Sequence, residues 1–285
     1  MTSPGRSSRP PRRRFGQHFL EPAWVSKVVS AIQPKPSDVF VEVGPGRGAL
    51  TYSLTSAAAK VVAVEVDRDL VQELGANAPS NLTVIAEDFL QVSPDQLRTA
   101  LGTMAGVNTT LRLAGNLPYN AASPILFKVL ELYADGLSFQ DATVMVQREV
   151  ADRLLAKAGT RDYGVMTIFV CQAADVTPLL ALPPGAFRPP PKVHSSLVKL
   201  RLHPLKPAAR DARLFSRLVH AVFSRRRKML SNALMALVDQ DPSILADRES
   251  IRTVLARAEL DPRRRPETLT LGEFVHLADA IVESS

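Results

Sequence analysis

Short apolar runs that alternate with helical patterns are the feature that most restricts how this chain can fold. The apolar runs span residues 38–43, 60–66, 82–86, 111–114 and 142–146, and helical patterns span residues 49–58, 68–76 and 123–133. Strands that are apolar along their whole length have to be buried on both faces, which is the situation in a parallel sheet covered by helices. The order therefore predicts a doubly wound α/β fold.

The pattern changes after Gln147. We expect a helix through Lys157 and further β-rich runs at residues 165–170 and 196–202, with a proline-rich loop at residues 183–192 between them. Beyond Pro204 only helical patterns remain, at residues 213–223, 225–237, 250–258 and 271–282. These changes predict a flexible basic arm (residues 1–14), an α/β domain (residues 15–204) and a small helical domain (residues 205–285).

The positive charge of the chain is concentrated in two segments. Of the formal net charge of +7, residues 1–14 supply five arginines without an acid, and residues 206–228 supply eight basic residues against Asp211 alone, so the rest of the chain carries −5. Charge that is clustered in this way is typical of a protein that binds a polyanion such as nucleic acid. A solvated tail and a solvated helix face are the alternative interpretation.

Several classes of protein are disfavoured by the composition. The single cysteine, Cys171, allows no internal disulfide, and the five histidines show no metal-ligand spacing, so we expect no metal site. No apolar run is long enough to span a membrane, and no apolar segment follows the N-terminal arginines as it would in a signal peptide. We therefore expect a cytoplasmic protein that does not enter a membrane.

A glycine-rich loop follows the first predicted strand and leads into a helix. Gly44, Gly46 and Ala49 fit the G-x-G-x-x-A form of dinucleotide-binding loops, whereas Gly44, Gly46 and Gly48 fit the G-x-G-x-G form of methyltransferases that use S-adenosylmethionine. Glu65, at the end of the second strand, could accept hydrogen bonds from the ribose hydroxyls of either cofactor. A purely structural glycine turn is the remaining alternative.

Polar residues also follow the third and fourth strands. Asp88 could accept a hydrogen bond from the amine of a bound adenine, although a lone aspartate is more often a helix N-cap. Residues 115–120 read Gly-Asn-Leu-Pro-Tyr-Asn. The Asn116 side-chain oxygen and the Leu117 carbonyl could draw the exocyclic amine of adenine toward tetrahedral geometry, and Tyr119 could stack on the base. The alternative is an asparagine-proline turn with a packed tyrosine.

Taken together, these motifs resemble the small-subunit ribosomal RNA adenine dimethyltransferases, the kasugamycin-sensitivity enzymes of bacteria and their archaeal and eukaryotic relatives. The resemblance covers nearly the whole chain from Phe15. It is carried by the glycine loop, Asp88 and the segments at residues 15–20, 65–69, 116–120, 147–153, 187–195 and 223–230. The fold that the family implies is a Rossmann-like S-adenosylmethionine-dependent methyltransferase domain with a small C-terminal helical domain.

The resemblance also implies roles for individual residues. It implies cofactor contacts at His18, Leu20, Gly44, Glu65, Asp88 and Asn116, a target-base pocket of Asn116, Leu117, Tyr119 and Phe187, and an RNA-binding helix with Arg225, Arg226, Arg227 and Lys228. Without the resemblance, Phe187 would be assigned to core or loop packing. The first motif of the family usually has asparagine where this chain has His18, which could still hydrogen-bond the methionine carboxylate of the cofactor.

The activity implied by the family is dimethylation of the N6 amines of two adjacent adenosines near the 3′ end of small-subunit (16S) rRNA, with S-adenosylmethionine as cofactor and the small ribosomal subunit as partner. We expect a monomer. The alternatives are a large-subunit rRNA adenine methyltransferase of the antibiotic-resistance type, a ribosome-assembly or mitochondrial transcription factor with the same fold, and a dehydrogenase. Leu117 and residues 189–193 argue against the first, and nothing in the sequence resembles a hydride-transfer site.

Overall fold

The computed structural model describes residues 18–76, 78–102 and 111–284. Within them, a sheet of seven strands has the order β4-β3-β2-β5-β6-β9-β7. The strands are β2 (Val39–Val43), β3 (Lys60–Glu65), β4 (Leu82–Ala86), β5 (Leu111–Asn116), β6 (Phe139–Gln147), β7 (Ala174–Leu182) and β9 (Ser195–Leu202). The five strands from β4 to β6 pair in parallel, which confirms the α/β fold. The predicted arm at residues 1–14 and the motif residues 15–17 lie outside the described residues.

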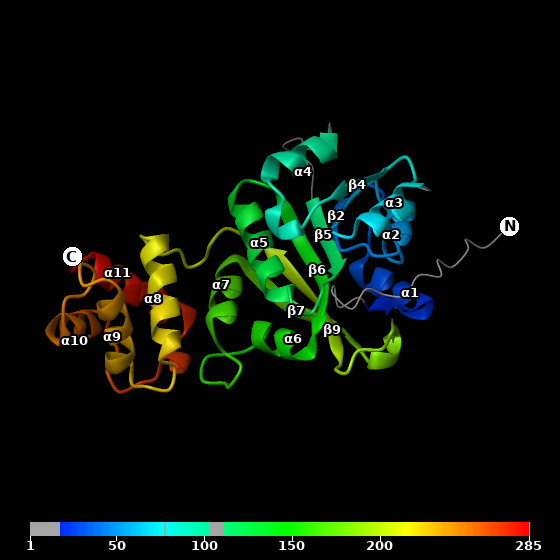
Figure 1. The fold of residues 1–285 in the computed structure, drawn as a ribbon. Helices are drawn as coiled ribbons and strands as arrows, with labels where there is room; N and C mark the ends of the chain where they lie inside the picture. Colours follow the sequence, from blue (N-terminus) through cyan, green and yellow to red (C-terminus); the bar gives the residue numbers. More distant parts are fainter. Residues whose placement is uncertain (1–17, 77, 103–110, 285) are drawn as a thin grey trace. The chain divides into compact units, whose positions relative to one another are not determined.

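Helices cover this sheet on both faces. They are α1 (Pro22–Ile32), α2 (Thr51–Ala57), α3 (Arg68–Ala76), α4 (Pro94–Leu101) and α5 (Ala122–Ala134). Figure 1 shows α1, α2 and α3 on one side of the sheet and α4 and α5 on the other. Helix α1 buries Val25, Val28 and Ile32 in the hydrophobic cluster that also contains Phe40 of β2. Helices α1 and α4 were not predicted from the sequence.

The strand order reverses beside β2, and this reversal determines where a ligand can bind. From β2 the chain continues outward to β3 and β4, and it then returns to place β5 on the other side of β2. The loops that leave the carboxyl ends of β2 and β5 consequently run in opposite directions and open a crevice between them. Gly44 directly follows β2, and Asn116 is the last residue of β5.

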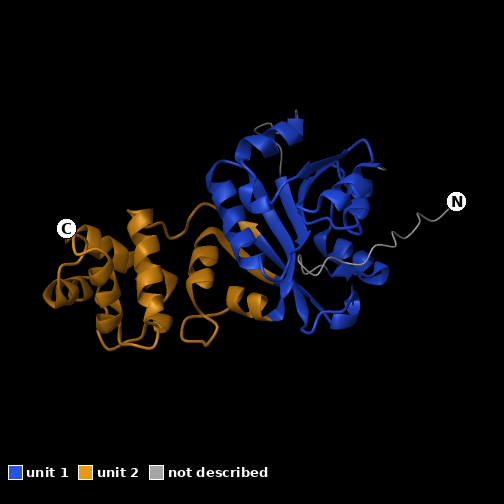
Figure 2. Ribbon diagram, in the orientation of Figure 1, with its two compact units in different colours: residues 1–148, 178–200 blue, residues 149–177, 201–285 orange. Residues whose placement is uncertain are grey.

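The chain divides into two compact units (Figure 2). Unit 1 comprises residues 1–148 and 178–200, and unit 2 comprises residues 149–177 and 201–285. Helix α6 (Arg148–Leu154) and strands β7 and β9 lie where the chain passes between the units. The units follow spatial contacts rather than sequence order, and the domain boundary expected after residue 204 stays a prediction.

The prediction of a β-rich run at residues 165–170 was wrong, because these residues belong to helix α7 (Val165–Ala173). A short apolar run with no alternation of polar residues is compatible with a buried strand and with a buried helix. Local hydrogen bonds favour the helix, since Gly164 N donates to Thr167 Oγ1 and Thr167 Oγ1 donates to the Arg153 carbonyl.

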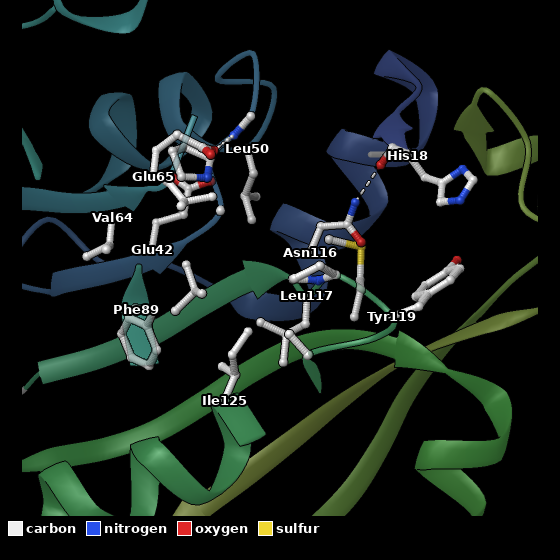
Figure 3. Close-up of a pocket in the computed structure, with 18 of the residues that line it drawn as sticks. His18, Glu42, Leu50, Val64, Glu65, Phe89, Asn116, Leu117, Tyr119 and Ile125 are labelled. Carbon is white, nitrogen blue, oxygen red and sulfur yellow. Dashed lines mark hydrogen bonds between the residues drawn. The ribbon is translucent and has the colours of Figure 1, made fainter. Parts of the chain in front are cut away.

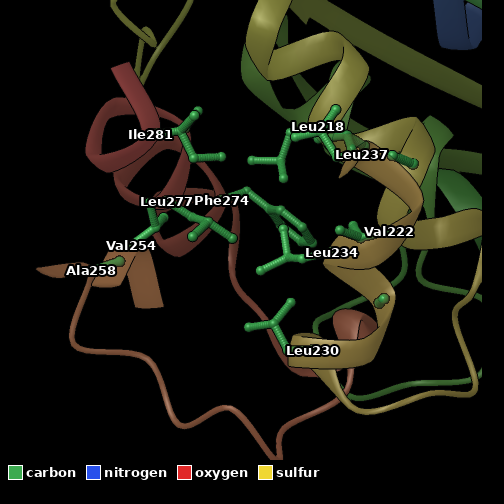
Figure 4. Close-up of a cluster of buried hydrophobic side chains, with 14 of the residues drawn as sticks. Leu218, Val222, Leu230, Leu234, Leu237, Val254, Ala258, Phe274, Leu277 and Ile281 are labelled. Carbon is green, nitrogen blue, oxygen red and sulfur yellow. The ribbon is translucent and has the colours of Figure 1, made fainter. Parts of the chain in front are cut away.

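The described elements after residue 204 are helical. They are α8 (Ala212–Ser224), α9 (Leu230–Gln240), α10 (Arg248–Arg257) and α11 (Leu271–Val282), with a 3₁₀ turn, η5 (Pro266–Thr268). Their apolar faces share one core, in which Figure 4 shows Leu218, Leu234 and Phe274 converging. The helix expected at residues 225–237 begins later, at Leu230, because residues 225–228 form a turn with hydrogen bonds from Arg226 N to Phe223 O and from Lys228 N to Arg225 O.

Candidate active site

A pocket of about 270 Å³ lies at the carboxyl ends of β2, β3 and β5, in the crevice at the strand reversal (Figure 3). Its lining includes the sequence-predicted residues His18, Leu20, Gly44, Glu65, Asp88, Asn116, Leu117 and Tyr119. These residues come from β1 (Phe19–Leu20) and from the ends of four strands of the sheet. The tertiary structure therefore brings together residues that are distant in the sequence.

The glycine loop approaches this pocket with main chain alone. Gly44 has φ +65° and Gly46 has φ +58°, a left-handed region that side chains with a Cβ rarely adopt. A Cβ on Gly46 would lie 3.0 Å from the Phe19 ring. Gly46 N donates to Glu65 Oε2 at 3.0 Å, so the loop is fixed to the end of β3. A ligand can therefore contact the loop backbone directly.

Glu65 is buried and held in one orientation by main-chain donors. Its Oε1 accepts from Asp67 N at 2.9 Å, and its Oε2 accepts from Gly46 N. Burial raises the pKa of Glu65, and the hydrogen bonds from backbone N–H groups oppose that rise. Each carboxylate oxygen keeps a second lone pair, so Glu65 can accept from the two hydroxyls of a ribose.

Glu42 is a pocket residue to which the sequence analysis assigned no role. It is 2% exposed, and its Oε2 has no hydrogen-bond partner among the described residues. Burial raises the pKa of Glu42 to about 8, the Thr51 hydroxyl opposes the rise, and the charge of Glu65 adds to it. A carboxyl inside the apolar run at residues 39–43 was the signal that could have identified it.

Asp88 caps a short helical turn and also borders the pocket, while its contact with a bound adenine stays a prediction. It is the N-cap of a 3₁₀ turn, η2 (Phe89–Gln91), where its Oδ1 accepts from Leu90 N at 3.0 Å. It also lines the pocket. Only one oxygen is engaged in this bond, so the carboxylate can cap the turn and accept from a ligand at the same time.

Asn116 has a fixed amide orientation. Its Nδ2 donates to the His18 carbonyl at 2.7 Å (Figure 3). A carbonyl accepts only from the NH₂ group, which means that the Asn116 Oδ1 is directed away from His18. The neighbouring Leu117 is held by a hydrogen bond from its N–H to the Met145 carbonyl at 3.1 Å.

Tyr119 is held at its hydroxyl and stacked on one face. Its hydroxyl lies 2.7 Å from Ser195 Oγ, and burial raises the pKa of the phenol while this bond opposes the rise. The His18 ring stacks on Tyr119 with a centroid separation of 5.3 Å and an interplanar angle of 28°. His18 Nδ1 lies 2.7 Å from the Pro189 carbonyl. The cofactor contact expected for His18 stays a prediction.

Phe187 is not among the residues that line the pocket. It is 1% exposed, belongs to the hydrophobic cluster of unit 1, and is paired with Leu20 through β1 and β8 (Phe187–Arg188). This is the packing role that the sequence alone favoured. Its role against a target base, which only the family resemblance implied, stays a prediction.

The basic segment at residues 225–228 contains two kinds of side chain. Arg225 pairs with Asp239, and Arg226 donates to the Thr160 carbonyl and lies 3.9 Å from Glu267. Arg227 and Lys228 are exposed. Within the segment, these two are therefore the better placed to reach an external polyanion.

A second basic turn lies beside the first, and the sequence reasoning missed it. Leu230 N donates to the Arg264 carbonyl at 2.6 Å, which brings residues 263–265 to the start of α9. Arg263 and Arg265 are exposed, although Arg263 Nε lies 3.5 Å from Asp261, and Arg264 pairs with Glu273. The three consecutive arginines could have identified this turn as a basic segment. Neighbouring acids reduce its local net charge, so it does not stand out in the charge distribution.

Two absences concern only the part of the chain that the structure describes. No group of three or more histidine, cysteine, aspartate or glutamate side chains is arranged to hold a metal ion. In residues 18–76, 78–102 and 111–284, none of the helices has both the length and the apolar character required to cross a bilayer.

Comparisons with known proteins converge on one family. The family model described as ribosomal RNA adenine dimethylase matches residues 10–274. Two relatives carry the name ribosomal RNA small subunit methyltransferase A. The one from Acinetobacter baylyi is 38% identical over 95% of this chain and 92% of its own, and the one from Laribacter hongkongensis is 40% identical over 94% and 95%.

Solved structures agree with this result. A dimethyladenosine transferase from Plasmodium falciparum has a TM-score of 0.72 at 25% identity, covering 91% of this chain and 96% of its own. The 23S rRNA methyltransferase ErmE has a TM-score of 0.60 at 20% identity, covering 93% and 99%, a likeness that shows the fold.

Proposed function

Because the chain belongs to the ribosomal RNA adenine dimethylase family, we propose that it transfers methyl groups from S-adenosylmethionine to the N6 amines of two adjacent adenosines near the 3′ end of small-subunit rRNA, dimethylating each. Membership of this family supports S-adenosylmethionine, rather than a dinucleotide, as the ligand of the glycine loop. The observation that carries the mechanism is the fixed amide of Asn116 at the end of β5, whose oxygen is directed away from the His18 carbonyl.

The residues present suit this cofactor. The left-handed backbone at Gly44 and Gly46 allows the cofactor to approach the main chain closely. The oriented carboxylate of Glu65 can accept hydrogen bonds from both hydroxyls of its ribose. We assign cofactor binding to the pocket residues His18, Leu20, Gly44, Glu65, Asp88 and Asn116. When bound, S-adenosylmethionine supplies a methyl group activated by its sulfonium.

The protein's task is to make the adenine amine nucleophilic. Its lone pair is delocalised into the ring, so the amine has to be drawn toward tetrahedral geometry. The Asn116 Oδ1 and the Leu117 carbonyl accept its N–H groups and stabilise the positive charge that develops on nitrogen. After transfer from the bound cofactor, the alkylated amine would release its surplus proton to water, so no residue of the chain is required as a general base. The second transfer begins with a single N–H, so one acceptor then suffices.

Base and RNA recognition use separate parts of the chain in this proposal. Tyr119 stacks on the extruded adenine, with Phe187 contributing if the loop after β8 rearranges. Arg227 and Lys228, together with Arg263 and Arg265, contact rRNA phosphates, whereas Arg225 and Arg226 shape the turn. A cytoplasmic location is consistent with a ribosomal substrate, and the monomeric state stays a prediction.

A labelling experiment tests the proposal. The protein is incubated with methyl-labelled S-adenosylmethionine and small ribosomal subunits that lack the modification, and labelled nucleosides are mapped. We expect dimethyladenosine at two adjacent positions near the 3′ end. Naked large-subunit rRNA is the control, and labelling of that RNA in place of the small subunit would overturn the substrate assignment.

A further inference from the structure

A loop between α6 and α7 lies beside the two basic turns of unit 2. Gly159 N donates to the Glu267 carbonyl at 2.6 Å, and Arg226 Nη2 donates to the Thr160 carbonyl at 3.1 Å. The two turns are joined to each other by a main-chain hydrogen bond at the start of α9. All three segments belong to unit 2, drawn in orange in Figure 2. They are far apart in the sequence but adjacent in space, and they form a basic junction of residues 157–161, 225–228 and 263–265.

The loop has a fixed shape that keeps its basic side chains at the surface. Thr160 N and Thr160 Oγ1 both donate to the Lys157 carbonyl, at 3.0 and 2.7 Å, and Gly159 between these residues has φ +86°. The loop ends at Tyr163, which is 5% exposed and belongs to the hydrophobic core of unit 2. Lys157 and Arg161 are exposed. Because the turn is closed by its own hydrogen bonds and anchored by a buried ring, a ligand does not have to order it.

The charges of the basic junction divide into an inner pair and an outer set. Glu267 Oε2 lies 3.9 Å from Arg226 Nε, and the side chains of Glu267 and Arg226 are 17% and 33% exposed, so their opposite charges cancel inside the junction. The exposed acids in or next to the three segments are Asp162 and Asp261, the latter 3.5 Å from Arg263. The outer face is therefore positive, with the exposed cations Lys157, Arg161, Arg227, Lys228, Arg263 and Arg265.

We propose that residues 157–161 are a third RNA-contacting segment, in which Lys157 and Arg161 bind backbone phosphates of the rRNA that the two basic turns hold. This inference rests on the proposed function, because it extends the same RNA interface. The loop is continuous with turns that the proposed function assigns to rRNA phosphates, and every cation placed against a phosphate adds affinity independently of base sequence. The RNA interface consequently includes a loop that precedes helices α8 to α11 in the sequence.

The salt dependence of binding tests the contact. Lys157→Ala/Arg161→Ala removes both cations of the loop. Arg201→Ala/Arg213→Ala is the matched control, because it removes two exposed arginines of unit 2 outside the basic junction. Filter binding to unmodified small subunits across a salt series gives the affinity and the slope of log K against log salt concentration. For the loop variant we expect a slope smaller in magnitude by about 1.5 to 2 and an affinity lower by about 30- to 100-fold at 0.1 M salt. The control variant should keep the wild-type slope.

Chemical protection tests the position of Lys157 directly. An acylating reagent modifies exposed lysine amines, and mass spectrometry compares their modification in the free protein and in its complex with small subunits. Lys157 and Lys228 should be modified in the free protein and protected in the complex. Lys35, which is exposed and lies just before β2 at the end of the sheet opposite the pocket, is the reference and should be modified in both.

The outcomes that contradict the third segment are specific. An unchanged slope in Lys157→Ala/Arg161→Ala overturns it, and so does equal modification of Lys157 in the free protein and in the complex. The same flattening in the control variant attributes the effect to total charge and overturns the proposal as well. Weaker binding with an unchanged slope assigns the loop to a ribosomal protein instead of rRNA.

Failure of this inference can be distinguished from failure of the proposed function. The loop variant should bind S-adenosylmethionine with a Kd within two-fold of wild type, measured by calorimetry, which shows that it is folded. If wild-type protein labels no small subunits, the proposed function itself has failed. Normal wild-type labelling with an unprotected Lys157 overturns the third segment alone.

Discussion

At the scale of single residues, the site depends on how polar atoms are oriented. The Asn116 amide is fixed by the His18 carbonyl, and the Glu65 carboxylate is fixed by two main-chain N–H groups. In both cases the protein supplies the partner that determines which atom faces a ligand. Such fixed dipoles stabilise developing charge without reorganising during the reaction.

Removal of the Asn116 amide should abolish methyl transfer. In Asn116→Ala the acceptor for the adenine N–H is lost, and we expect kcat to fall by at least about 10² to 10³. Initial rates with labelled S-adenosylmethionine measure the loss. Binding of the variant to small subunits is the control and should be nearly unchanged. Turnover close to wild type would remove Asn116 from the mechanism.

Glu42 should make stability depend on pH. Its ordinary pKa is 4.5, and burial raises it to about 8 in the folded protein. Between these values the unfolded chain ionises Glu42 while the folded protein keeps it protonated, so wild-type stability falls as pH rises through this window. Glu42→Gln does not titrate, and its stability relative to wild type should increase by several kcal/mol from pH 5 to pH 8.

Denaturant unfolding of wild type and Glu42→Gln at several pH values measures this effect. Glu73→Gln, which changes an exposed glutamate on α3, is the matched control and should follow the wild-type profile. Parallel profiles for wild type and Glu42→Gln would contradict a protonated Glu42.

At the scale of elements, one buried arginine joins α1, β2, β5 and β6. Arg112 of β5 is 4% exposed, lies 2.7 Å from Asp38 and 3.0 Å from Asp141, and donates to the Ile32 carbonyl at the end of α1. These bonds neutralise most of the buried charge, to which Lys199 Nζ, 3.4 Å from Asp141, and the Lys35 N–H donor to Asp38 also contribute. The network therefore joins these elements near the amino-terminal ends of the strands, at the end of the sheet opposite the pocket.

Breaking this network should be costly. Arg112→Leu removes the buried cation that pairs with both carboxylates, and we expect a loss of about 3–5 kcal/mol in the free energy of unfolding. Arg201→Leu is the control, because its pair with Asp175 is exposed and should contribute about 1 kcal/mol or less. Chemical denaturation measures both variants, and equal losses would contradict the network's role.

At the scale of the whole molecule, the positive charge is divided between local ion pairs and free surface. Arg225 and Arg226 have acidic or carbonyl partners within unit 2, whereas Arg227 and Lys228 are exposed. The net charge of +7 alone does not distinguish these groups. Only the exposed residues are expected to release counterions from RNA.

Removal of the exposed charges should reduce the salt dependence of RNA binding. For Arg227→Ala/Lys228→Ala we expect weaker binding to small subunits. The slope of log K against log salt concentration should be smaller in magnitude by about 1.5 to 2. Filter binding across a salt series measures the slope. Arg248→Ala/Arg252→Ala removes two exposed arginines from α10 of the same unit as the control. The same flattening in the control would show that total charge, rather than this turn, determines binding.

The sequence by itself determined the parallel sheet and the glycine loop, and the residues that it predicted for the cofactor and base sites all line the pocket except Phe187. Apolar runs specify burial on both faces, and motifs at strand ends converge because parallel strands share one edge. It did not determine helix α7, because a short apolar run satisfies either secondary structure until local hydrogen bonds select one.

Only the tertiary structure decided which atoms of these residues are free to act. It leaves Glu42 Oε2 without a hydrogen-bond partner among the described residues, pairs Arg225 with Asp239, and stacks His18 on Tyr119. Each of these outcomes depends on a partner that is distant in the sequence or on the exclusion of water, and neither is encoded in a local pattern. The sequence therefore identifies the residues of the site, whereas packing determines the orientation, protonation and accessibility of their side chains.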